Sequence, residues 1–373
     1  MRILYVTDAL AIWGGIERIL VEKSNFLAEK CGFDVHFITI NQGSHPILFP
    51  LNESVNYKDL DIRFHQQYDS YGIRRLIKKW TLKKLFVNRL TEYISDVNPD
   101  LIVTARTELL PEIVTAKGAI PLVYESHSSY ISDSYLSDGW FSLLKSKYLI
   151  RNVQYANMVV ALTDGDAAEW RKVTTNVCVI PNIVNLNKSG IFSNCENKIV
   201  IFVGRFSRQK DISSLLTIWS IVSDKFPDWR LHIYGGYGEE QNRLVDIIRE
   251  KHTNISVFAP TPNIFDKYLE SSLLLLTSLF EPFGLVLPEA MSCGLPVVAF
   301  DCPYGPRDII RDGVDGFVIA NRDINKFAEK VCLLMGNHEL RVKMGKEGIK
   351  SSSRYEDTKI MPKWIQLFQS LKA

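Results

Sequence analysis

Short, continuously apolar segments recur along the chain and alternate with longer amphipathic ones. The first, RILYVT at residues 2–7, precedes a glycine turn, and a helical pattern then runs to about Lys30. These segments are apolar throughout, rather than at every second position, which is typical of parallel strands covered by helices on both faces. Their alternation with helical patterns predicts doubly wound α/β sheets. Predicted strands lie at 2–7, 34–40, 101–104, 121–125, 158–162 and 177–181, and then at 198–204, 230–236, 255–260, 272–278 and 296–300.

A polar segment at residues 182–198 has no periodic pattern and separates the two series of strands. A length of 373 residues also favours two domains, at roughly 100–200 residues each. We predict an N-terminal domain over 1–182, a C-terminal domain over 183–356, and a closing helix over 357–373 that packs back on the first domain. Ligands of such sheets bind beyond the carboxyl ends of the strands. The informative residues should therefore follow the strands and face a cleft between the domains.

Composition limits the classes of protein that fit. The formal charge is +2, from 44 basic and 42 acidic residues, which excludes a nucleic-acid-type polycation. No run of about 20 apolar residues predicts a spanning helix, and Asp8 interrupts the N-terminal apolar run too early for a signal peptide. The six cysteines form no C-x-x-C pair and no zinc-finger spacing. We expect a cytoplasmic protein with reduced thiols, and only peripheral contact with a membrane.

Two basic residues, Arg205 and Lys210, follow the predicted strand at 198–204. An arginine fork and a mobile lysine at a strand's carboxyl end suit a phosphate or diphosphate. The alternative is a basic loop that faces water.

Two glutamates follow the predicted strand at 272–278, in the segment F-E-P-F-G-L-V-L-P-E-A-M-S-C-G. Glu281 precedes a predicted helix that begins near Gly284, and the first amides of a helix can bind an anion. Glu289 lies in a stretch too apolar to be a solvent-facing surface, so its carboxylate needs a partner. That partner is either a neighbouring cation or the hydroxyls of a sugar or ribose.

In the first half, W-G-G-I-E-R at residues 13–18 follows the first strand, and Gly14 and Gly15 let the backbone approach a ligand closely. This is not the dinucleotide fingerprint G-x-G-x-x-G, and a plain strand-to-helix turn is the alternative. His127 follows the strand at 121–125. A lone histidine is usually structural, but its position beyond a strand end favours a site. A role for Glu125 or Ser126 stays open.

Together these motifs resemble the retaining glycosyltransferase family four. Glu281 and Glu289 are separated by seven residues, Gly204-Arg205 is followed by Lys210 in the pattern G-R-x-x-x-x-K, and the chain begins with a G-G-x-E-R segment. The resemblance implies the GT-B fold, in which two Rossmann-like domains with parallel sheets face each other across a cleft.

The resemblance also implies roles for the candidate residues, with no cofactor and no metal. Asp164-Gly165-Asp166 looks like the D-x-D motif of metal-dependent enzymes, but we interpret it as a helix N-cap with acidic residues in the first turn. By the resemblance, Arg205 and Lys210 hold the donor diphosphate, Glu281 binds hydroxyls of the transferred sugar, Glu289 binds the ribose, the amides of Phe283, Gly284 and Leu285 face sugar and phosphates, Gly14 and Gly15 face the phosphates, and His127 supports the transition state beside the sugar.

Residues 71–90 form a basic amphipathic stretch, with Ile73, Leu76, Ile77 and Trp80 on one helical face. It predicts either an ordinary surface helix or one that contacts anionic lipid head groups or acceptor diphosphates; nucleic acid is a distant third.

The resemblance thus implies a retaining transferase that moves a sugar from a UDP- or GDP-sugar to a saccharide or lipid-linked saccharide. Its product would be a bacterial cell-surface polysaccharide such as lipopolysaccharide or capsule, made at the inner face of the plasma membrane. The alternatives are a non-hydrolysing nucleotide-sugar epimerase and a catalytically silent nucleotide-sugar-binding scaffold. The glutamate pair beside the Gly-Arg/Lys segment favours transfer.

Overall fold

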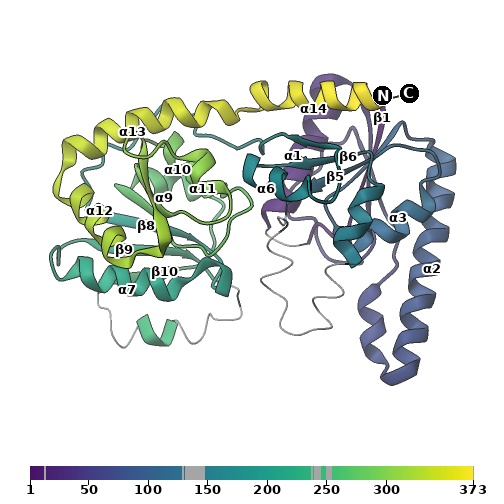
Figure 1. Ribbon diagram of the computed structural model, residues 1–373, viewed down its shortest axis with the longest axis horizontal. Coiled ribbons are helices and arrows are strands. Elements are labelled where there is room, and N and C mark those ends of the chain that lie inside the picture. Colours follow the sequence, from purple (N-terminus) through teal and green to yellow (C-terminus); the bar gives the residue numbers. More distant parts are fainter. Residues whose placement is uncertain are drawn as a thin grey trace. The chain divides into compact units, whose positions relative to one another are not determined.

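The computed structural model describes residues 1–11, 14–127, 130, 148–236, 238, 245–248 and 254–372, and the chain divides into two compact units (Figure 1). Each unit holds one parallel sheet, as the sequence predicts. Unit 1 comprises Met1–Leu162, Asp166–Ile180 and Met361–Ala373; unit 2 comprises Thr163–Gly165 and Pro181–Ile360.

Unit 1 contains a seven-stranded parallel sheet in the order β3-β2-β1-β4-β5-β6-β7. Helices α2 and α3 bury Phe86, Leu90 and Ile113 against the strands, because their apolar residues recur at helical spacing. The elements are β1 (Arg2–Thr7), α1 (Gly15–Cys31), β2 (Asp34–Thr39), β3 (Val55–Asp59), η1 (Phe64–Asp69), α2 (Gly72–Val97), β4 (Leu101–Thr104), η2 (Thr107–Leu109), α3 (Leu110–Ala116), β5 (Leu122–Ser126), η3 (Val153–Tyr155), β6 (Met158–Ala161), α6 (Asp164–Trp170, shared with unit 2) and β7 (Val177–Val179).

Unit 2 contains a six-stranded parallel sheet in the order β10-β9-β8-β11-β12-β13. Trp219 of α7 and Phe327 of α12 share a core with this sheet, and α10 packs on α13 (Figure 1). The elements are β8 (Ile199–Gly204), η4 (Arg208–Lys210), α7 (Ile212–Ser223), β9 (Arg230–Gly235), β10 (Ile255–Phe258), α9 (Ile264–Leu269), β11 (Leu273–Leu276), α10 (Val286–Ser292), β12 (Val297–Phe300), α11 (Gly305–Ile309), β13 (Gly316–Ile319), η5 (Ala320–Arg322), α12 (Ile324–Gly336), α13 (His338–Ser352), η6 (Ser353–Tyr355) and α14 (Asp357–Leu371, shared with unit 1).

Every predicted strand is present, with ends that differ by at most two residues, and two strands are additional. β3 reads VNYKD and has one buried residue, because it is the edge strand and faces water. The second sheet does not end at residue 300 as predicted, since β13 adds a further strand, GFVI. All six cysteines are free. Within the described ranges, every helix is too short or too polar to cross a membrane.

The C-terminal helix α14 belongs to unit 1 from Met361 onward. Its apolar residues Met361, Trp364 and Phe368 are buried. Near the chain end, Lys372 lies 3.3 Å from the carboxylate of Asp100, so the last turn is also fastened to unit 1.

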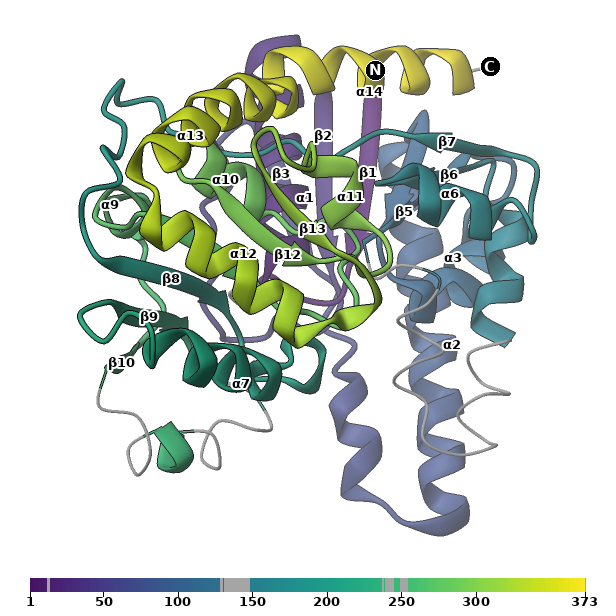
Figure 2. The ribbon, with the colours of Figure 1, turned by 60° about the vertical axis from the view of Figure 1, so that its left-hand side comes forward.

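Helix α2 projects at its N-terminal end, next to η1 (Figure 2). Its apolar residues there are exposed, with Ile73 74% and Trp80 64% accessible. Two of the basic side chains in residues 71–90 already have partners within the protein. Lys83 pairs with Glu112, and Arg89 donates to the Leu60 carbonyl at 2.5 Å. The exposed apolar residues of this stretch therefore lie in its first half, residues 71–80.

Candidate functional site

Lys210 and Glu281, which lie 71 residues apart, form an ion pair in unit 2. The stem of Lys210 crosses Gly204 at the end of β8, where a Cβ would stand 3.4 Å from its Cδ and Cε. Glu281 follows β11 and is only 4% exposed. Ser278 donates to the same Oε1 at 2.7 Å, so a cation and a hydroxyl offset the cost of burying this carboxylate. The structure thus places two predicted site residues together.

The backbone of Glu281 is held by the segment that follows β12. Its N–H donates to the Pro303 carbonyl at 2.7 Å, and its own carbonyl accepts from Tyr304 and Gly305 at 2.8 and 2.9 Å. Gly305 lies against the chain at Phe283, where a Cβ on the glycine would stand 1.8 Å from the Phe283 carbonyl oxygen. The loop that carries Glu281 is consequently fixed at its backbone as well as at its carboxylate.

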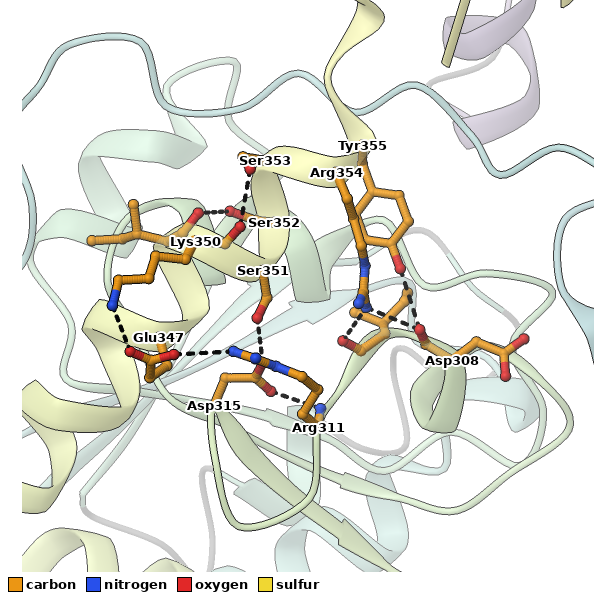
Figure 3. Close-up of polar contacts among 12 residues, drawn as sticks. Asp308, Arg311, Asp315, Glu347, Lys350, Ser351, Ser352, Ser353, Arg354 and Tyr355 are labelled. Atoms are coloured by element: carbon orange, nitrogen blue, oxygen red, sulfur yellow. Dashed lines mark hydrogen bonds and ion pairs between the residues drawn. The ribbon is translucent and has the colours of Figure 1, made fainter. Parts of the chain in front are cut away.

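Helix α11, which begins at Gly305, is anchored at its far end by residues of η6 (Figure 3). Arg354 donates to the carbonyls of Asp308 and Ile309 at 2.9 and 2.6 Å, and the Tyr355 hydroxyl donates to Asp308 at 3.3 Å. The Tyr355 ring also packs edge-on against Phe283, with centroids 5.2 Å apart. One tyrosine therefore supports both α11 and the loop that carries Glu281.

A second anchor lies just after α11. Asp315 is fully buried and accepts from the Arg311 N–H and Nε at 2.8 and 2.9 Å and from Ser351 at 2.5 Å (Figure 3). Arg311 also reaches Glu347 of α13 at 3.3 Å. These contacts join the turn before β13 to helix α13.

Arg322 braces the same end of the sheet and was not predicted from the sequence. Its guanidinium pairs with Asp211 and donates to the carbonyls of Ser278 and Thr277 at 2.9 and 3.0 Å. Asp211 directly follows Lys210, and Ser278 contacts Glu281, so Arg322 is bound to both neighbours of the pair. The available signal was a basic residue just after an apolar strand, but that strand, β13, was itself missed.

The turn between Glu281 and α10 contains three predicted residues. Gly284 has φ +91°, which an L side chain rarely adopts, so glycine is required there. Among the residues that the structure describes, the N–H groups of Phe283, Gly284 and Leu285 have no acceptor. The helix itself begins at Val286, two residues later than predicted.

Glu289 lies in α10 and is 4% exposed. The buried Tyr268 donates its hydroxyl to Glu289 Oε2 at 3.2 Å. Arg205, by contrast, lies in the loop after β8 with an exposed side chain that makes no ion pair with any described residue. Within the part of the chain that the structure describes, no ion pair or hydrogen bond joins Arg205 to the Lys210–Glu281 pair.

In unit 1, α1 begins at Gly15, with Gly14 as its N-cap. The carboxylate of Glu17 folds back over Gly14, so that a Cβ on the glycine would stand 2.1 Å from Glu17 Oε2. Glu17 Oε1 also pairs with Arg106 Nη2 at 2.5 Å, just beyond the end of β4. Glu17 and Arg106 were not predicted as site residues; a charged residue directly after a buried strand was the available signal.

His127 lies just beyond β5 and is bonded to Glu125 of that strand. Its Nε2 is 2.8 Å from Glu125 Oε2, and the same oxygen accepts from Lys23 of α1. All three side chains are buried. Burial lowers the pKa of His127, and the cations of Lys23 and Arg106 lower it further, while Glu125 opposes them. Burial acts to raise the pKa of Glu125, but Lys23 and His127 outweigh it, so that pKa is below its ordinary value.

The Asp164-Gly165-Asp166 segment forms the first turn of α6. Asp166 is 1% exposed and accepts from Ser126 at 2.6 Å, from the Tyr130 N–H at 2.9 Å and from Trp170 at 3.1 Å. Burial raises its pKa. These contacts give Asp166 a structural role, and within the described ranges no group of three acidic, histidine or cysteine side chains is placed to hold a metal ion.

Two family models match the chain in succession. The model described as Glycosyltransferase Family 4 matches residues 13–188, and the one described as Glycosyl transferases group 1 matches residues 185–351. Together they span the segments that carry every candidate residue named above.

Curated proteins and solved structures resemble the chain over nearly its whole length. An uncharacterized glycosyltransferase of Haemophilus influenzae is 29% identical, with 94% of this chain and 95% of the relative covered. The amylovoran biosynthesis glycosyltransferase AmsD of Erwinia amylovora is 27% identical over 97% of this chain and 98% of its own length. A mutant of S. aureus TarM, crystallised with fondaparinux, alpha-GlcNAc-glycerol and UDP, shares the fold, with a TM-score of 0.80, 17% identity and coverage of 98% and 99%.

Proposed function

This chain belongs to the glycosyltransferases of the GT-B fold, and we propose that it transfers a sugar, with retention of configuration, from a UDP- or GDP-sugar to a saccharide or lipid-linked saccharide. We place this reaction in the synthesis of a bacterial cell-surface polysaccharide. AmsD, which is similar over nearly the whole chain, is named for such a pathway.

The observation that carries the proposal is the ion pair of Lys210 and Glu281 beyond the ends of β8 and β11. A lysine suits the diphosphate of a nucleotide-sugar as a point charge, and a carboxylate suits the hydroxyls of the sugar attached to it. The two side chains are already in contact, so a donor that carries both groups meets both ligands at once. Arg205 adds a second cation for the diphosphate, and Glu289 binds the ribose.

The chemistry we propose relies on positioning and charge. The leaving diphosphate takes the acceptor's proton as the acceptor attacks the same face of the sugar. Lys210, together with the unbonded amides of Phe283, Gly284 and Leu285, stabilises the charge that develops on the phosphates. Glu281 and Glu289 lie on one short segment, which does not suit the opposed carboxylates of a glycosidase. We propose that no metal ion takes part.

The acceptor side is assigned to unit 1. His127 contacts the transferred sugar, and Gly14 and Gly15 approach the phosphates through the backbone. The exposed apolar and basic residues of α2 suit an anionic lipid surface. We therefore place the enzyme at the cytoplasmic face of the plasma membrane, where a lipid-linked acceptor is presented.

The test is a thermal-shift screen with UDP, GDP, ADP and their common sugar conjugates, with and without EDTA. A ligand that binds the folded state raises Tm, and UDP comes first because the TarM crystal contained it. The nucleotide that shifts Tm is then assayed as its sugar conjugate with saccharide and lipid-linked acceptors, and NMR of the product gives the anomeric configuration. An inverted product would refute retention, and loss of the shift in EDTA would refute the metal-free site.

A further inference from the structure

Three elements of unit 1, and the residue that follows one of them, meet at one buried ion pair. Lys23 comes from α1, Glu125 from β5 and His127 from the residue after β5, while Trp364 comes from the C-terminal helix α14. The Lys23 ammonium lies 3.8 Å from the centroid of the Trp364 ring, close enough for a cation–π contact. The ammonium is thus enclosed by a carboxylate and an indole, and both it and its carboxylate are no more than 1% exposed.

The fold itself does not require this pair. Removing two charges from water costs several kcal/mol per ion, and apolar residues of similar volume are often as stable or more stable at such a position. A buried lysine–glutamate pair whose carboxylate bonds the residue beside the strand end therefore suggests a role beyond stability. The contact that they make with the candidate site is the bond from Glu125 to His127.

That bond determines which ring nitrogen carries the proton. Glu125 Oε2 accepts from Lys23, and an ionised carboxylate can only accept, so His127 must donate from Nε2. In a neutral imidazole the other nitrogen, Nδ1, is then an acceptor. Within the described ranges, no hydrogen bond involves Nδ1.

The charged groups that face His127 come from three elements. Glu125 favours the imidazolium form, whereas Lys23 of α1 and Arg106, beyond β4, oppose it, and burial opposes it most. Burial and the two cations together outweigh the carboxylate, so the pKa of His127 lies below its ordinary value and the neutral ring is favoured.

We propose that Lys23 and Glu125 are positioning residues, which hold His127 as the neutral tautomer protonated at Nε2 so that Nδ1 accepts a hydrogen bond from a sugar hydroxyl. Trp364 covers the ammonium and makes α14 part of this arrangement. The inference rests on the proposed function, in which His127 contacts the transferred sugar.

The first experiment records the side-chain ¹⁵N NMR resonances of His127 in the intact protein, assigned with His127→Gln. We expect a protonated Nε2 and an unprotonated Nδ1 at pH 7. A proton on Nδ1, or on both nitrogens, would overturn the inference. This measurement needs no substrate, so a missing transfer activity would count against the proposed function and leave the tautomer result standing.

The second experiment changes the charge behind the carboxylate. Lys23→Met removes the cation that opposes the imidazolium, and Glu125 then interacts with His127 but with no lysine. The pH midpoint of the His127 titration should therefore rise. Lys30→Met is the matched control, because Lys30 is an exposed lysine on the same helix that pairs with Glu29. Equal midpoints in the two variants would show that Lys23 does not act on His127.

The third experiment separates positioning from stability. Glu125→Gln can donate its amide to Nε2 and reverse the tautomer, which should lower kcat by about tenfold to a hundredfold, the loss that a misplaced group causes. The double variant Lys23→Met/Glu125→Leu replaces the pair with apolar side chains and should recover Tm but not kcat. If kcat returned together with Tm, the pair would have a structural role only, and the inference would fail.

Discussion

Gly305 lies so close to Phe283 that a Cβ on the glycine would stand 1.8 Å from the Phe283 carbonyl oxygen and 2.5 Å from its carbonyl carbon. The contact places the start of α11 directly against the loop that carries Glu281, and the Gly305 N–H donates to the Glu281 carbonyl at 2.9 Å. The residue at 305 therefore sets the distance between two segments of the candidate donor site.

We expect Gly305→Ala to damage both stability and activity. The methyl group meets backbone rather than a flexible side chain, so the loop must shift, at a cost of about 1–3 kcal/mol. Thermal melts and donor KM measure the two effects. Gly336→Ala is the control, because a Cβ there would lie 3.6 Å from the Phe226 ring, an ordinary packing distance. If Gly305→Ala and Gly336→Ala had the same Tm and the same donor KM, the close approach of Gly305 to Phe283 would not matter for function.

Lys210→Ala and Glu281→Ala should each reduce transfer by about two orders of magnitude or more, the scale of losing one oriented charge contact. Because the two side chains are paired, the double variant should lose less than the product of the single losses. Initial rates at saturating donor measure this. Lys198→Ala is the matched control, since Lys198 pairs with Asp228 just before β8 and both side chains are more than half exposed. Near-wild-type rates in both single variants would refute the site assignment.

The sheets could be predicted because their strands are apolar on both faces. β11, which reads LLLL and is almost completely buried, can be predicted from its own apolar residues without knowledge of the strands beside it. β3 cannot, because an edge strand with one exposed face reads as a polar loop. The same reasoning identified Lys210, Glu281 and His127 as candidate residues, since each follows such a strand.

The partners of these residues could not be predicted, because they come from distant parts of the chain. Lys23 and Glu125 are 102 positions apart, and a lysine within an amphipathic helix ordinarily faces water. Arg322 meets Asp211 across 111 positions. Only the order of strands in the sheet brings such residues together. The sequence pattern identifies strand ends but not the strands that are neighbours.

Arg322→Lys should weaken donor binding while the protein stays folded. The guanidinium serves Asp211 and the carbonyls of Thr277 and Ser278 at once, and an ammonium cannot reproduce that fork. A loss of about 1.5–3 kcal/mol, typical of hydrogen bonds to a charged group, corresponds to roughly tenfold to 150-fold in kcat/KM.

Arg307→Lys is the control for this substitution. Arg307 also holds an aspartate with a fork, at 2.8 Å to Asp301, but its side chain is two-thirds exposed. Kinetic measurements at varied donor concentration should show the loss in Arg322→Lys alone. An equal effect in both variants would indicate that any arginine fork near the sheet contributes as much.

Binding of α2 to anionic vesicles is the prediction that concerns the membrane. Arg74, Arg75, Ile77 and Trp80 lie in its exposed first turns, so each basic residue should contribute about 1 kcal/mol at the lipid surface. Arg74→Ser/Arg75→Ser should therefore weaken vesicle binding by about an order of magnitude or more. Ile77→Ser should weaken it through lost apolar burial.

The control and the lipid composition make this result specific. Lys83→Ser removes a charge that already pairs with Glu112, so it should change vesicle affinity least. Vesicles of neutral lipid should bind the wild-type protein weakly, and added salt should weaken binding to anionic vesicles, because exposed charges are screened over about 10 Å at 0.1 M. Vesicle binding that is unchanged in Arg74→Ser/Arg75→Ser and insensitive to salt would make α2 an ordinary surface helix. The enzyme would then have to meet its acceptor through some other part of unit 1.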